Sequence, residues 1–363
     1  MNITAAATRR RLHRVLRRLM PFWWWLFWFY CAWATIIIVG GLWHQVLAHW
    51  PIAVAMAAGS YVAGSTPMGG GTVGFPILVL LFDQPASLGR NFSYCVQSIG
   101  MSSATVFLLA NRAVIAWRFL LWTTVGSMIT LPLTAIYVVP IVPDLTVKLL
   151  FACLWAAFGV MTLYKLRDFV RAHHVPQCRD TLGMTLGLAA GLLGGVSSGL
   201  TGVGIDMILY TLLVLVYRCD LRVAIGTSVM IMAINSLFGV LISGSMGRLS
   251  PEVFYNWLAA APIVAVGAPL GALMMAIIPR YATLFFVSIL CLMQFVWTCW
   301  QERSDLGWVG LAAAIGAVVV LNLVFHFLYR WGERLVPRRS EPPVISYGYS
   351  NAQPPGDSAR RLR

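Results

Sequence analysis

Long apolar stretches, separated by short polar or charged connections, run through the 363-residue chain. A straight membrane-spanning helix needs about 20 predominantly apolar residues, and several stretches approach or exceed that length without an internal break. They lie at 22–47, 92–110, 118–140, 145–165, 225–244, 255–278, 282–300 and 308–329. The pattern therefore predicts an all-α polytopic membrane protein with about eight full transmembrane helices.

Two further apolar regions are each broken by glycine. In the first, the pieces 51–65 and 72–82 flank "STPMGGGTVGFP", and in the second, 182–200 and 205–217 flank the glycines of "SSGLTGVGID". Glycine and proline disfavour a helix interior, and a membrane core tolerates irregular backbone only where protein or a water-filled cavity covers it. We expect two re-entrant hairpins with the glycines at their tips. Two full crossings by each broken pair are the alternative, with the same sidedness.

The charges of the connections predict the sidedness, because cytoplasmic connections carry an excess of Lys and Arg. The N-terminus, the connection 111–118 and the loop 166–181 contain arginines, whereas 44–50 and 141–147 contain neither Lys nor Arg. Both ends of the first hairpin should therefore lie outside and both ends of the second inside. The expected location is the inner (plasma) membrane, with both termini cytoplasmic.

The chain divides into two repeats with flanking segments. The expected boundaries are a basic cytoplasmic N-terminus (1–20), a first transmembrane helix (21–48), repeat 1 (49–165), a basic cytoplasmic loop (166–181), repeat 2 (182–300), a last transmembrane helix (308–330) and a disordered cytoplasmic tail (337–363). The glycines of the two broken regions coincide at an offset of about 133, and an odd number of crossings per repeat inverts the second copy. Inverted repeats with matching broken segments are the best pointer in a sequence to a transporter's binding site.

The glycine motifs also carry a family resemblance. "GGGTVGFPILVLL" and "SSGLTGVGIDMILY" are each followed by a small polar patch, "NFSYCVQS" and "IGTS". Over about residues 50–305 the chain resembles the TauE/SafE sulfite exporter family. It departs from the family pattern at 92–94 and at Asp206, where many members have a small residue. The resemblance implies export of small sulfur-containing anions, such as sulfite or organosulfonates, with proton coupling.

An anion inside a membrane must exchange its water for other hydrogen-bond donors. Helix N-termini supply unpaired N–H groups and a partial positive charge, and the second arm of each hairpin begins a helix just after the glycines, at Thr72 and Ile205. Glycine lets backbone approach a ligand closely, although tight helix packing is an alternative role. Likewise, any single Ser or Thr could simply bond the carbonyl one turn earlier. The candidate substrate-binding residues are Thr66, Gly69, Gly70, Gly71, Thr72, Ser93, Gln97, Ser198, Thr201, Gly202, Gly204, Thr227, Ser228 and Asn235.

Asp206 is the sharpest single candidate, because an intramembrane carboxyl group is a functional hypothesis by default. Burial disfavours its charged form, so it could carry a proton together with an anion. A helix cap is the competing role, since Asp206 lies in the first turn after "GVG". Arg90 and Arg222, at the entries to 92–110 and 225–244, are interpreted mainly as interfacial topology determinants, although each could attract anions.

Composition narrows the class of function. The chain is 59% hydrophobic and only 10% charged, and much of its net charge of +14 lies at the two ends, so we expect a lipid bilayer and no nucleic acid as partner. The seven cysteines form no CxxC pair, no phosphate-binding GxxxxGK[ST] occurs, and no cluster of acid or base residues lies at membrane depth. We therefore expect no metal, no cofactor and no enzymatic activity.

The leading hypothesis is a secondary transporter that moves a small anion by alternating access around a midplane site formed by the two hairpin tips. An anion channel, or a non-transporting assembly or sensor subunit, is the alternative. A homo-oligomer is compatible with either.

Overall fold

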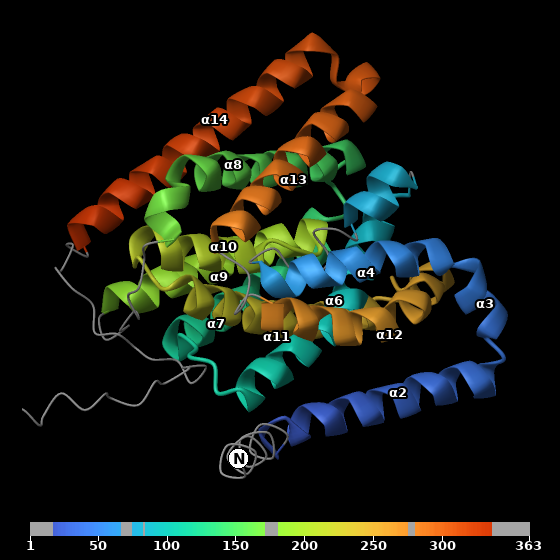
Figure 1. Ribbon diagram of the computed structural model, residues 1–363. Helices are drawn as coiled ribbons and strands as arrows, with labels where there is room; N and C mark the ends of the chain where they lie inside the picture. The colour runs from blue at the N-terminus through green and yellow to red at the C-terminus, as the bar shows by residue number, and fades with distance from the viewer. Residues whose placement is uncertain (1–16, 67–74, 83, 171–180, 275–279, 336–363) are drawn as a thin grey trace, which may run out of the picture.

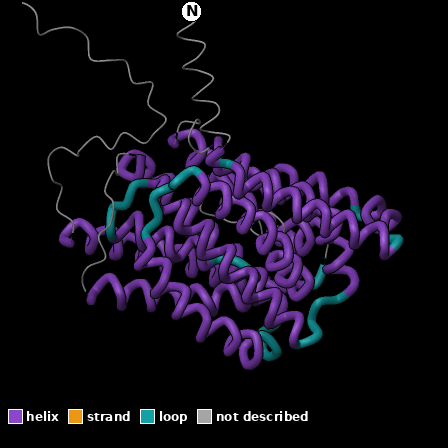
Figure 2. Tube along the Cα trace, turned by 90° about the horizontal axis from the view of Figure 1, so that it is seen from below, coloured by secondary structure: helices purple, strands orange, loops and turns teal. Residues whose placement is uncertain are grey.

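The computed structural model describes residues 17–66, 75–82, 84–170, 181–274 and 280–335. These residues form helices joined by short connections, and no β-strand occurs among them (Figure 2). The helices are α2 (Met20–Gly40), α3 (Trp43–Ala48), α4 (Trp50–Ser65), α6 (Ala86–Ala110), α7 (Trp117–Leu133), α8 (Asp144–Val170), α9 (Thr181–Thr201), α10 (Ile205–Thr211), α11 (Leu221–Ser245), α12 (Pro251–Met274), α13 (Arg280–Gln301) and α14 (Arg303–Leu335). Three π-helical turns complete them: η1 (Ile77–Leu81), η2 (Thr134–Val138) and η3 (Leu212–Val216).

In the described part of the chain, 9 helices are long and apolar enough to cross a membrane. Eight of them coincide with the predicted full crossings, which confirms the all-α polytopic membrane class. The ninth is α9, the first arm of the second broken pair, whose 21 residues measure about 31 Å. The second broken pair therefore consists of one arm of membrane-spanning length and one short arm, α10 with η3.

The first predicted span, 22–47, is divided in the structure. Helix α2 ends at Gly40, because Gly41 adopts a left-handed conformation with φ +62°, and α3 follows as a separate short helix. The left-handed region carries no steric penalty for glycine, so the break falls where the sequence has two consecutive glycines. The apolar pattern alone did not distinguish one long helix from two.

The two halves pack in corresponding ways. Helix α4 packs on α12 just as α9 packs on α7, and α6 pairs with α11 while α8 pairs with α13 (Figure 1). The π-helical turns η1 and η3 are offset by 135 residues, as are the 25-residue helices α6 and α11. An exchange of the two halves thus maps each helix pair onto its counterpart, with an offset close to that expected from the glycines.

Contacts between α6 and α11 fix their relative direction. The hydroxyl of Ser243 donates to Oδ1 of Asn91 at 3.2 Å, whereas Leu108, near the other end of α6, lies beside Gly226. Residue numbers therefore rise along one helix as they fall along the other. The central pair of helices is antiparallel, which is what inverted repeats require.

Helices α2 and α14 lie on opposite sides of the bundle in Figure 1. Helix α2 is attached through the Tyr30 hydroxyl and the Trp33 indole N–H, which donate to backbone carbonyls of α12 at 2.6 and 2.9 Å. Helix α14 is attached at one end by the ion pair of Lys148 with Glu302 (2.5 Å) and at the other by that of Arg218 with Glu333 (3.2 Å). Most of each helix is exposed and apolar, as expected of surfaces that face lipid.

Candidate functional site

The break between α9 and α10 brings backbone close to α6. Gly202 and Gly204 have φ values of +82° and +106°, which side-chain-bearing residues rarely adopt. A Cβ on Gly202 would lie 2.6 Å from the carbonyl oxygen of Arg90 and 3.0 Å from Cβ of Ser93. Glycine is therefore needed at 202 both for its backbone conformation and for the close approach of the turn to α6. Its packing role is evident.

Gln97 joins this turn to α6. Its Nε2 donates to the backbone carbonyls of Ser93 at 3.0 Å and of Gly202 at 3.2 Å. Two acceptors on the same side fix the orientation of the amide, because Nε2 is the only donor of the group. Within the described chain, Oε1 of Gln97 and Oγ of Ser93 are buried and have no hydrogen-bond partner. The turn thus borders two polar atoms with unused hydrogen-bonding capacity.

A buried network lies next to the turn and links four helices. Nδ2 of Asn235 donates to Oγ of Ser198, and Oγ of Ser127 donates to Oδ1 of Asn235, both at 2.6 Å. The hydroxyl of Tyr94 donates to the backbone carbonyl of Ser198 at 2.5 Å. Ser198 and Asn235, both predicted site residues, therefore hold α6, α7, α9 and α11 together. The roles of Ser127 and Tyr94 escaped the sequence analysis, and only the rarity of polar groups in apolar helices could have signalled Ser127.

Thr201 and Asp206 complete the turn. The Thr201 hydroxyl donates to the Ser197 carbonyl at 3.0 Å and accepts the N–H of Val203 at 3.3 Å. Oδ1 of Asp206 accepts the N–H groups of Met207 at 2.9 Å and Gly204 at 3.2 Å, which stabilises the start of α10 as a cap would. Oδ2 is buried and has no partner among the described residues.

Ser228 and Thr227 lie far from this turn. The antiparallel register of α6 and α11 places Ser228 level with residue 106 of α6, thirteen residues beyond Ser93. At 1.5 Å per residue the two serines are about 20 Å apart along the helix axis, so one small anion cannot contact both. The Thr227 hydroxyl donates to the Val223 carbonyl at 2.6 Å and accepts the N–H of Ala116 at 3.0 Å, which ties α11 to the start of α7.

Most of the first hairpin tip, including Gly69, Gly70, Gly71 and Thr72, lies outside the described residues. Thr66 is described and donates to the Val62 carbonyl one turn earlier, at 2.7 Å. A cavity of about 610 Å³ lies beside it, between α4, α12 and α13, with an almost wholly apolar lining. Such a lining offers few groups to bind an anion.

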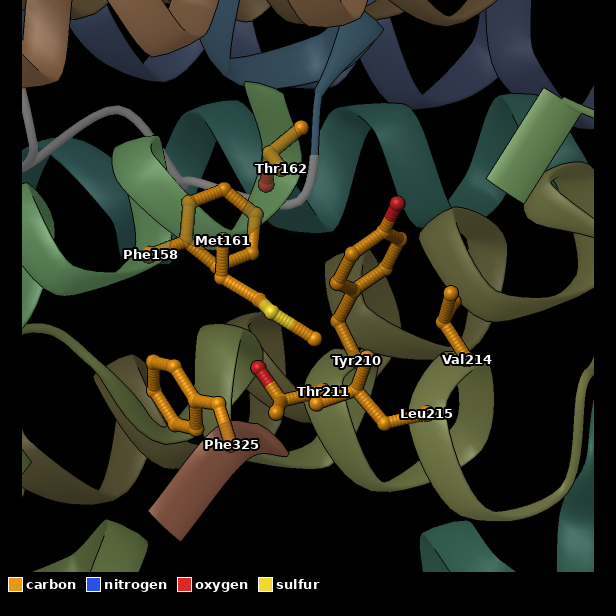
Figure 3. Close-up of a pocket in the computed structure, with 8 residues that line it drawn as sticks. All are labelled: Phe158, Met161, Thr162, Tyr210, Thr211, Val214, Leu215 and Phe325. Atoms are coloured by element: carbon orange, nitrogen blue, oxygen red, sulfur yellow. The ribbon is translucent and has the colours of Figure 1, made fainter. Parts of the chain in front are cut away.

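A second, much smaller void lies between α8, the α10–η3 segment and α14 (Figure 3). Its volume is about 10 Å³, and the side chain of Met161 points toward Tyr210 and Thr211 across it. A space of this size holds one water molecule at most. The void is therefore excluded as a substrate site and is a packing feature of the α8–α14 contact.

The burial of Arg90 was not predicted from the sequence. We interpreted it as an interfacial residue, and in the structure it is only 6% exposed and its backbone lies directly against Gly202. Its position near the end of an apolar segment suggested the membrane interface, and only the packing of the second hairpin against α6 reveals its burial. Arg222, by contrast, lies at the start of α11, where its backbone N–H donates to the capping carboxylate of Asp220 at 2.8 Å.

Membrane-length helices, two corresponding halves and a glycine-broken helix pair beside buried polar groups define the class of protein. It is an all-α multi-pass membrane protein built like a secondary transporter. The family model described as Sulfite exporter TauE/SafE matches residues 51–296, and the chain belongs to this transporter family. The match begins after α2 and α3 and ends before α14, so these helices flank the shared part. Comparison with curated proteins and with solved structures gave no match.

Proposed function

We propose that this membrane transporter exports a small sulfur-containing anion, sulfite or an organosulfonate, by alternating access. The substrate binds beside the Gly202 turn, between the α9–α10 break and α6. The observation that carries the proposal is a pair of buried polar atoms at this turn, Oγ of Ser93 and Oε1 of Gln97, that have no hydrogen-bond partner among the described residues. Buried polar groups normally find hydrogen-bond partners, so two such atoms beside a broken helix favour a ligand there.

The sulfur-anion class comes from the family, whose description names sulfite export. Alternating access is supported by the inverted correspondence of the two halves, in which one repeat can rock against the other. Gly202 and Ser93 belong to different repeats, so their contact would change in such a motion. A channel would use the same turn without an occluded state, and saturation of the flux separates the two mechanisms.

We further propose that Asp206 carries a proton with the anion. One carboxyl oxygen accepts two backbone N–H groups, and the other, Oδ2, has no partner in the described part of the chain and is where a proton would bind. A fixed negative charge beside the turn would repel an anion. A protonated Asp206 removes this repulsion while the substrate is bound.

The test uses the purified protein in proteoliposomes with an imposed pH gradient. Flux of sulfite, sulfoacetate, thiosulfate and sulfate is measured for the wild type, Asp206→Asn and Asp305→Asn, the last removing an exposed carboxylate at the start of α14. We expect sulfur-anion flux that the gradient accelerates in the wild type and in Asp305→Asn. Asp206→Asn should keep anion exchange at equal pH but lose the acceleration.

Two results would contradict the proposal separately. Acceleration that persists in Asp206→Asn overturns the proton-carrier role and leaves the transporter intact. Absence of flux for all four anions in the wild type, in vesicles that hold a pH gradient, overturns the substrate class.

A further inference from the structure

Arg90 is a buried cation near the start of α6. No carboxylate among the described residues lies within ion-pair distance of its guanidinium, although Asp144 and Arg248 are close enough to act on it electrostatically. Asp144 instead accepts the N–H of Ala86 through Oδ2 at 3.2 Å. A charge inside a membrane protein is costly unless it is paired. The position therefore suits a counter-charge that arrives with a ligand.

Arg90, Ser93 and Gln97 share one face of α6. Their spacing of three and then four residues places them one above another on the helix surface. The second hairpin lies against this part of α6, since Gly202 is next to the backbone of Arg90 and Cβ of Ser93 and its carbonyl accepts a hydrogen bond from Gln97. Along this strip the chain offers a cation, a hydroxyl donor and an amide oxygen, which is an acceptor only.

The equivalent strip of the second repeat lacks two of these groups. At the 135-residue offset of α6 and α11, the counterparts of Arg90, Ser93 and Gln97 are Ile225, Ser228 and Met232. Only the serine hydroxyl is retained, and it too is buried without a partner in the described chain. The two halves of the transporter therefore differ in charge where they correspond in backbone.

We propose that Arg90, Ser93 and Gln97 form a charge-selective strip for a singly charged oxyanion that itself carries a hydrogen-bond donor, such as hydrogen sulfite. This rests on the proposed function and assigns the protonation state of its substrate. The guanidinium neutralises one negative charge, and the Ser93 hydroxyl donates to an oxyanion oxygen. Oε1 of Gln97 accepts from the donor of the ligand. A fully deprotonated dianion would leave this oxygen unpaired and one charge uncompensated.

The strip also gives the two halves of the transporter different affinities for the anion. It lies near the start of α6, on the predicted outer side, about 20 Å along the helix from Ser228. The anion is held more tightly at the strip than at the uncharged Ile225–Ser228–Met232 counterpart. Substrate affinity should therefore depend on Arg90 much more than on any residue of that counterpart.

The test measures sulfite counterflow by the full-length protein in proteoliposomes over a range of equal internal and external pH. Hydrogen sulfite and sulfite interconvert near neutral pH, so the half-saturation concentration can be expressed for each form. In Asp206→Asn, which has no carboxyl at 206 to bind the proton, the half-saturation concentration should stay constant across pH when expressed as hydrogen sulfite. Arg90→Gln should raise it about 10- to 100-fold, the effect of losing one charge-assisted hydrogen bond, and Arg90→Lys should raise it less.

Two further variants separate the strip from general effects. Gln97→Met installs the residue of the second repeat and should weaken the preference for hydrogen sulfite over methanesulfonate, a competitor with one charge but no hydrogen-bond donor. Arg303→Gln removes an exposed charge on the same predicted side and should leave the half-saturation concentration unchanged. Together the two variants distinguish contact with the ligand from a change in surface potential.

An unchanged half-saturation concentration in Arg90→Gln, with an active wild type, would overturn the strip. A half-saturation concentration of Asp206→Asn that stays constant across pH when expressed as sulfite, and not as hydrogen sulfite, would overturn the assigned protonation state. If Arg90→Gln does not fold, Arg90→Lys and Gln97→Met take its place in the test. A wild-type half-saturation concentration in Arg90→Lys, together with a wild-type preference for hydrogen sulfite in Gln97→Met, would then overturn the inference. An inactive wild type contradicts the proposed function itself, which is a distinguishable result.

Discussion

Replacing Gly202 by alanine should destabilise the fold and disrupt transport together. A left-handed backbone costs a residue with a Cβ about 1–2 kcal/mol relative to glycine. The new Cβ would also lie only 2.6 Å from the Arg90 carbonyl oxygen, and such overpacking costs about 1–3 kcal/mol. We therefore expect the free energy of unfolding to fall by about 2–5 kcal/mol, and the turn to move away from α6.

The assay is reversible unfolding in mixed detergent–SDS micelles, followed by tryptophan fluorescence, together with sulfite counterflow. Gly316→Ala is the matched control, because no atom lies within 4 Å of a Cβ at this position of α14, and it should be neutral or slightly stabilising. Gly332→Ala controls for tight packing outside the site, since its Cβ would meet the Leu215 carbonyl oxygen. It should lower stability without changing the half-saturation concentration for sulfite.

A loss below about 0.5 kcal/mol in Gly202→Ala, together with wild-type counterflow, would refute this reasoning. It would mean that the turn between α9 and α10 neither requires a left-handed glycine nor lies against α6. An equal loss of stability in Gly316→Ala, where helix propensity favours alanine and a Cβ would meet no atom, would show that the assay does not report the contact of the turn with α6.

Two other contacts give predictions that the same unfolding assay checks. Asn235→Ala removes hydrogen bonds to Ser127 and Ser198 and should cost about 1–3 kcal/mol, because their hydroxyls lose buried partners; a loss no larger than that of an exposed control would contradict the network. Glu302→Gln should cost about 1–3 kcal/mol, because the side chains of Lys148 and Glu302 are only 13% and 12% exposed. The exchanged pair, Lys148→Glu with Glu302→Lys, should recover most of that loss, and no recovery would argue against direct pairing.

The features that could be predicted from the sequence are those set by residues close together in the chain. Apolar length predicted the eight full crossings, because the membrane imposes a minimum helix length whatever the tertiary contacts. The closely spaced glycines of "TGVG" predicted the break after Thr201, where Gly202 and Gly204 adopt conformations that disfavour other residues. These features depend on backbone chemistry within a few residues, which a single sequence contains.

Features that depend on the partner helix could not be predicted in the same way. The burial of Arg90 follows from the hairpin that lies over it, more than 100 residues away in the chain. The separation of Ser93 from Ser228 follows from the register of α6 on α11. Hydropathy gives the depth of a residue within its own helix but not the neighbour that its side chain meets. The extent of α9, Thr181–Thr201, agrees with the predicted segment 182–200 to one residue at each end, but its close packing on α7 could not be read from its own residues.

The measurement that tests the central claim most directly is counterflow of labelled sulfite into proteoliposomes that contain only the purified protein and excess unlabelled sulfite. The account predicts a transient accumulation of label that saturates with external sulfite. A secondary transporter exchanges substrate through an occluded site, and an open pore cannot produce such an overshoot. Label that merely equilibrates without saturation, or vesicles that take up no label at all, would contradict it.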